Sequence, residues 1–132
     1  MMNRDERMTK LKWSLQALAQ PADVQLSLFP DFVHKTDELM LDFDDALLVL
    51  KSEIWPTLSP CQTETLTRLD EKMTEMTEEP DPDHIPEEAL RSDPEWEALR
   101  GMAKQALSTF EWSDSPPPRE PEDRGTTYVG SK

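Results

Sequence analysis

The sequence is poor in the residues that hairpins, disulfide frameworks and phosphate-binding loops require. Its 132 residues include three glycines and a single cysteine, Cys61, and no long apolar run interrupts them. So few glycines disfavour tight hairpins and glycine-rich phosphate loops. One cysteine excludes an internal disulfide, and the lack of a membrane-length or signal-like apolar segment leads us to expect a cytoplasmic protein that makes no membrane contact.

The residues that are abundant favour helices. Leu, Glu, Ala, Met and Lys are good helix formers, and a chain of this length has room for one modest core, so we predict an all-α fold. We expect residues 1–112 to form one acidic helical domain. Residues 113–132 are rich in proline and charge and have almost no apolar anchors, which predicts a disordered tail.

The clearest pattern in the chain is an apolar stripe over residues 36–55. Large apolar residues recur there at spacings of three and four, as on one face of a helix, and Thr36 is expected to cap that helix. Such a stripe must be buried against other helices. Its members are Leu39, Met40, Phe43, Ala46, Leu47, Leu50 and Ile54.

Three more helices are predicted around this one. The first covers residues 5–20 and is stopped by Pro21; the others follow a capping box at Ser59 and a cap at Asp93. Residues 21–35 lack a helical period and are expected to form an extended, apolar connection. A small bundle of about four helices would bury the four one-sided stripes.

The negative charge is concentrated in the helical part. The formal net charge is −14, and residues 36–112 carry twenty acidic and six basic groups. Residues 70–97 alone carry twelve acids against two bases. A field of this sign disfavours direct binding to nucleic acid or anionic lipid and favours a basic protein partner, although the charge could also serve solubility alone.

By size and charge the chain resembles bacterial immunity proteins that block nuclease toxins, and also proteins that imitate DNA. The resemblance implies a non-catalytic inhibitor that neutralises a basic partner such as a nuclease-type toxin. We predict that acidic residues on two helices and the following connection form the binding surface. They are Asp42, Asp45, Glu71, Glu75, Glu78, Glu79, Asp81 and Asp83.

No residue pattern indicates catalysis, a metal site or a cofactor. Cys61 lacks the positive surroundings that promote a thiolate, so we expect it to be a small core residue. Asp81, Asp83 and His84 have no second histidine or cysteine at ligand spacing. We therefore predict that the protein is not an enzyme, and that it needs no cofactor.

One short motif offers a different function. The sequence Gln25-Leu26-Ser27-Leu28-Phe29 resembles the peptide by which bacterial replication and repair proteins dock on the DNA sliding clamp. The resemblance covers five residues and implies polar contacts for Gln25 and apolar anchoring by Leu26, Leu28 and Phe29. The alternative, which we favour, is that this segment is an apolar strap laid over the helices. Docking on the clamp is thus the second functional hypothesis.

Overall fold

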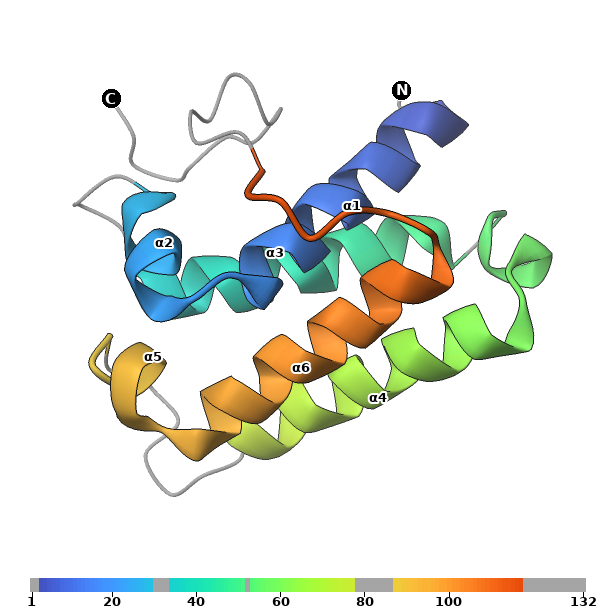
Figure 1. Cartoon of the computed structure of the whole chain (residues 1–132). Helices are drawn as coiled ribbons and strands as arrows, with labels where there is room; N and C mark the ends of the chain where they lie inside the picture. Colours follow the sequence, from blue (N-terminus) through green and yellow to red (C-terminus); the bar gives the residue numbers. More distant parts are fainter. Residues whose placement is uncertain (1–2, 30–33, 52, 78–86, 118–132) are drawn as a thin grey trace.

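The computed structural model describes residues 3–29, 34–51, 53–77 and 87–117, and all regular structure in these ranges is helical (Figure 1). The all-α prediction is confirmed. No helix within these ranges is long and apolar enough to span a membrane. The elements are α1 Arg4–Ala19, α2 Ala22–Ser27, α3 Lys35–Leu50, the 3₁₀ turn η1 Trp55–Thr57, α4 Pro60–Thr77, α5 Ala89–Ser92 and α6 Pro94–Thr109.

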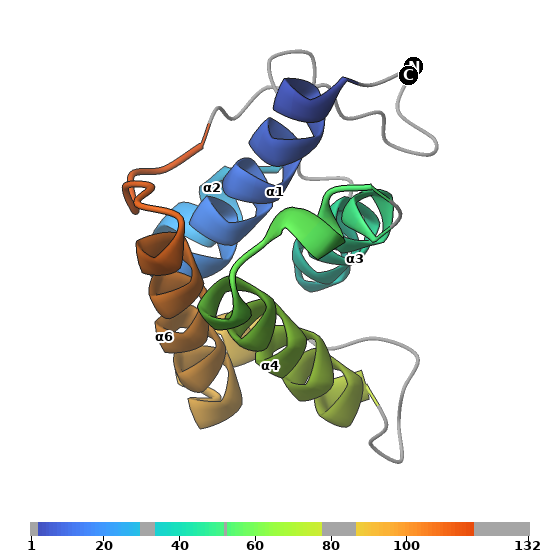
Figure 2. The same ribbon diagram turned by 90° about the vertical axis from the view of Figure 1, so that its right-hand side faces the viewer.

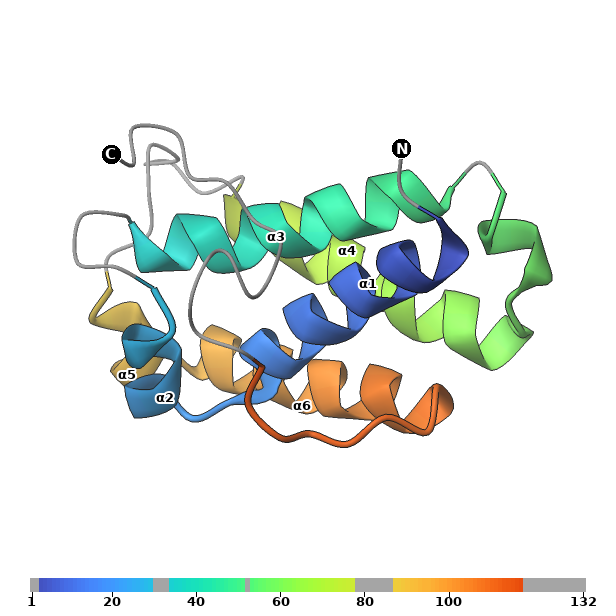
Figure 3. The same ribbon diagram turned by 90° about the horizontal axis from the view of Figure 1, so that it is seen from above.

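The four long helices contact one another in the order α3, α1, α6, α4. Helix α1 packs against both α3 and α6, and α6 packs in turn along α4 (Figures 1 and 3). Helices α3 and α4 contact each other much less, and Figure 2 shows the two diverging. The short helices α2 and α5 meet at one end of the molecule. The side between α3 and α4 is therefore the least closed.

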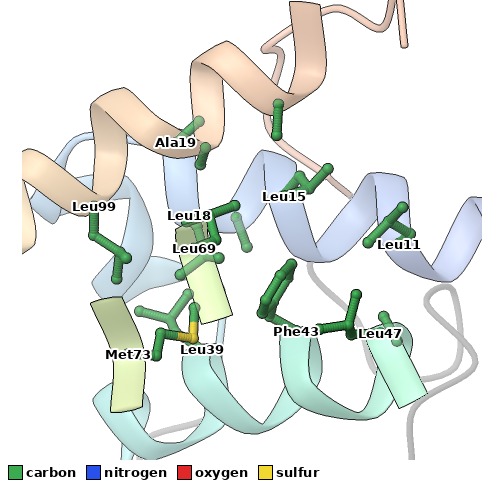
Figure 4. Close-up of a cluster of buried hydrophobic side chains, with 14 of the residues drawn as sticks. Leu11, Leu15, Leu18, Ala19, Leu39, Phe43, Leu47, Leu69, Met73 and Leu99 are labelled. Carbon is green, nitrogen blue, oxygen red and sulfur yellow. The ribbon is translucent and has the colours of Figure 1, made fainter. Parts of the chain in front are cut away.

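The core lies between these helices and contains the predicted apolar stripes. Phe43 of α3 points toward Leu15 of α1 in Figure 4, which also shows Leu69 and Met73 of α4 approaching from the other side. Met40 is only half-buried. All other predicted members of the α3 stripe are buried: Leu39, Phe43, Ala46, Leu47, Leu50 and Ile54.

The helix ends follow the capping pattern in two of three cases. Ser59 and Gln62 form the expected capping box, since the Ser59 N–H donates to the Gln62 side chain at 2.9 Å and the Gln62 N–H donates back at 3.2 Å. Asp93 accepts from the Glu95 N–H at 2.9 Å. The third case, Thr36, is wrong: helix α3 begins one residue earlier, and Thr36 is buried in its first turn.

The predicted extended connection is also wrong in its first half. Residues 22–27 form α2, whose first turn is closed by the Gln25 N–H donating to the Pro21 carbonyl at 3.0 Å. A helix of six residues is too short to show a recurring apolar period in the sequence. It is stabilised by the tertiary contacts described below. Residues 30–33 lie outside the described part of the chain.

The beginning of the predicted tail is packed. Beyond α6 the chain turns at Glu111, whose φ of 60° is in the left-handed region, and then runs along α1. The Gln16 side chain donates to the Ser113 carbonyl at 3.0 Å, and that of Gln20 donates to the Asp114 carbonyl at 2.7 Å. Residues 113 and 114 thus contact α1; residues 118–132 lie outside the described residues.

Candidate protein-binding surface

A groove of about 240 Å³ lies between α3 and α4, on the least closed side of the molecule. Two methionines make its floor apolar. Met73 is a buried core residue of α4, and Met40 is the half-buried member of the α3 stripe. The groove is lined by Met40, Leu41 and Asp44 from α3 and by Asp70, Met73, Thr74 and Thr77 from α4.

The outer face of α3 adds apolar surface beside this groove. Leu41 and Leu48 are 52% and 70% exposed, and they are the large apolar side chains that the described residues leave in solvent. They are seven residues apart, two helical turns, so they lie on one face of α3. Asp44 and Asp45 are exposed between them. This face therefore alternates apolar and acidic groups.

No basic side chain of α3 or α4 neutralises these acids. Lys35 is buried and pairs with Glu87 at 3.5 Å, and Arg68 pairs with Glu64 on its own helix at 2.8 Å. Lys72 turns toward α6, where its ammonium group donates a hydrogen bond to the Glu95 carboxylate, and this bond raises the pKa of Lys72. Nearby carboxylates, Glu75 among them, raise that pKa further.

Several exposed or half-exposed acids on these two helices have no such partner. Among the described residues, no ion pair or side-chain hydrogen bond involves the carboxylates of Asp44, Asp45, Asp70 or Glu71. Their combined field is therefore directed at solvent and is available to a partner.

The predicted acidic surface is retained in part. Asp45, Glu71 and Glu75 are exposed as expected. Asp42 must be corrected: it is 8% exposed, on the buried side of α3 beside Phe43, and cannot contact a partner in this structure. The remaining four predicted residues, Glu78, Glu79, Asp81 and Asp83, lie outside the described residues.

The pentapeptide that resembles a clamp-docking motif is folded into the core. Gln25 is fully buried in α2, and its side chain donates to the Ala17 and Leu18 carbonyls at 3.1 and 3.0 Å. These are carbonyls at the end of α1. The Gln25 Oε1 atom accepts from two nitrogens of Arg100, at 3.3 and 3.0 Å.

The apolar residues of the motif are also unavailable. Leu28 and Phe29 are 1% and 5% exposed, and Leu26 is partly buried against the same core. The segment thus contacts the core as a strap would, although it is helical rather than extended. Clamp docking through these residues would require α2 to detach from α1 and α6.

The described residues contain no group of three or more His, Cys, Asp or Glu side chains that could hold a metal ion. Cys61 is exposed at the start of α4, so its predicted place in the core is wrong.

The groove itself was missed in the sequence. Leu41 and Leu48 fall on the polar side of the α3 stripe at a spacing of seven, and this was the signal that could have indicated an apolar outer face. Its second wall, on α4, depends on how α3 and α4 pack, and no local sequence pattern predicts that.

Comparison with known proteins adds no relative to this description. No family model, no curated protein and no solved structure matches the chain.

Proposed function

We propose that this protein is a non-catalytic binding module that recognises a basic protein partner. The observation that supports the proposal most is the surface of α3 and α4, where exposed carboxylates without internal bases lie beside exposed leucines. Carboxylates of this kind attract Lys and Arg over about a Debye length, roughly 8–10 Å, and speed association. Apolar side chains beside them supply the contacts that slow dissociation.

Inhibition is the finer part of the proposal. A basic surface on a partner commonly serves to bind nucleic acid, and an acidic protein that covers it competes with the phosphate backbone. The same charge repels nucleic acid itself. We therefore expect the partner to lose nucleic-acid binding when it is complexed with this protein.

Charge reversal on α4 and α3 provides the test. The full chain and an Asp45→Lys, Glu71→Lys variant are immobilised, and proteins retained from the native cells are identified by mass spectrometry. The matched control, Asp5→Lys with Asp114→Lys, changes the net charge equally on residues outside these helices.

A basic protein should be retained by the parent chain and the control and lost by the α3–α4 variant. With that protein purified, its association rate should fall steeply between about 50 and 300 mM salt. Retention of the same partners by the α3–α4 variant, or an association rate that does not change with salt, would contradict the proposal.

Docking on a sliding clamp is the second candidate, and the observation in its favour is the resemblance of the Gln25–Phe29 segment alone. A synthetic peptide of residues 22–29 should bind a bacterial clamp more tightly than the intact chain does, since the intact chain must first release α2. Equal lack of binding by peptide and chain would remove this candidate.

A further inference from the structure

We propose that the groove between α3 and α4 binds a basic amphipathic helix of the partner protein. The inference rests on the proposed function and adds the site and the shape of its ligand. Apolar side chains of that helix enter between Met40 and Met73, and its Lys or Arg side chains pair with Asp44 and Asp70.

The size of the groove fits side chains rather than a complete small molecule. Its volume of about 240 Å³ is below the range of roughly 300–1,000 Å³ that is typical of drug-sized ligand sites. Methionines on the floor suit an anchor of variable shape, because their unbranched thioether chains adapt to irregular contacts.

The charge of the groove selects the kind of partner. Its charged lining residues are Asp44 and Asp70, and neither forms an ion pair with another described residue. A second copy of this chain would bring the same carboxylates against them, and an anionic lipid surface would bring phosphates. Both are repelled, whereas a segment rich in Lys and Arg is attracted.

The secondary structure of the site selects a helical ligand. An extended peptide binds best where an unpaired strand edge receives its backbone, and the described residues contain no strand. A helix satisfies its own backbone and offers side chains to a groove. Leu41 and Leu48 are seven residues apart, about 10 Å along α3, so apolar positions seven apart on the ligand would match them.

The test uses peptides of defined chemistry against the full chain. The probe is a fluorescent peptide of about 14 Leu and Lys residues, four helical turns, with leucines at helical spacing. A scrambled peptide of the same composition carries equal charge without an apolar face. Binding is followed by anisotropy, and thermal melting of each protein variant checks that it is folded.

Two groove variants and one control separate the contributions. Leu41→Gln with Leu48→Gln removes apolar surface at and beside the groove at constant charge, and Asp44→Asn with Asp70→Asn removes the two groove carboxylates. Asp5→Asn with Asp114→Asn removes the same charge from exposed acids outside α3 and α4. We expect each groove variant to weaken binding about tenfold or more and the control to weaken it less than threefold.

The outcomes distinguish this inference from the proposed function. If the scrambled peptide binds as well as the amphipathic one, and the leucine variant keeps the affinity of the parent chain, the helix-binding groove is overturned while a purely electrostatic partner surface stands. If neither basic peptide binds the parent chain, the acidic surface itself is rejected, and the proposed function fails with it.

Discussion

The junction where α1 ends against α2 and α6 uses its charged and polar groups quite differently from the groove between α3 and α4. At the junction Arg100 is 8% exposed, and its guanidinium donates to Gln20, Gln25, Leu90 and Glu97. In the groove, the two lining carboxylates have no such partners among the described residues. At the junction the polar groups are satisfied within the chain, whereas the groove leaves carboxylates that the proposed partner would neutralise.

Under the proposed function, this difference separates the residues that support the fold from those expected to bind the partner. Removing one partner from a buried network leaves other groups unsatisfied, at about 1–3 kcal/mol each. Removing an exposed side chain leaves nothing unsatisfied and changes stability little. Substitutions at the junction should thus lower stability, and those in the groove should lower affinity at nearly constant stability.

The largest expected effect compares two positions of α3. Phe43→Ala should destabilise the protein by about 3–5 kcal/mol, because it empties a fully buried site between α1 and α3. Leu48→Ala, on the outer face, should change the free energy of unfolding by no more than about 0.5 kcal/mol. Urea denaturation of both variants measures this, and a Leu48 loss as large as that of Phe43 would show the outer face to be packed.

The next effect probes the junction through α6. Arg100→Met preserves much of the apolar stem but leaves the Gln20 and Leu90 carbonyls and the Gln25 side chain without their donor. We expect a loss of about 1–3 kcal/mol in total, the cost of about one buried group left without a partner. Lys104→Met, an exposed position one turn further along α6, is the control and should be nearly neutral. Equal stability of the two variants would mean that water replaces Arg100 without cost.

A smaller effect is expected where the chain beyond α6 reaches the same junction. A chain that ends at Trp112 loses the acceptors of Gln16 and Gln20, whereas one that ends at Pro117 retains them. At about 0.5–1.5 kcal/mol for each hydrogen bond, the shorter chain should be less stable by about 1–3 kcal/mol. Melting of the two truncated chains side by side measures the difference, and identical curves would return the domain boundary to residue 112.

The long helices could be predicted from the sequence because the residues that each one buries recur at helical spacing along the chain. The apolar residues of α3 and α4 recur at helical spacing, and Ser59 with Gln62 marks the start of α4 by local chemistry alone. The end of α3 could not be predicted in the same way, because Ile54 continues the apolar stripe although the helix ends at Leu50.

The features that were missed depend on residues far apart in the chain. Helix α2 is held by Gln25 bonding to Arg100, 75 positions away, and the start of the tail is held by Gln16 and Gln20 of α1. Acidity alone could not show that Asp42 is buried while Asp45, on the same helix, is exposed. For the groove, the sequence indicated an acidic surface, but only the crossing of α3 and α4 brings Asp44 and Asp70 together.

The smallest expected effect concerns the ion pair on the side of α4 that faces α6, away from the groove. Lys72 and Glu95 form an ion pair, and its hydrogen bond raises the pKa of Lys72 above the ordinary 10.5. Because the folded protein holds this proton more tightly, the stabilisation is fully present below about pH 10.5 and is lost as the pH rises through the raised value. The pair is near the surface, so we expect it to contribute at most about 1 kcal/mol to the free energy of unfolding.

Urea titrations of the parent chain, Lys72→Met, Glu95→Gln and the double variant isolate the coupling between the two side chains. A coupling that persists at alkaline pH would show that Glu95 does not bond the charged amine. The carboxylate that faces α6 would then be no better neutralised than those of the groove.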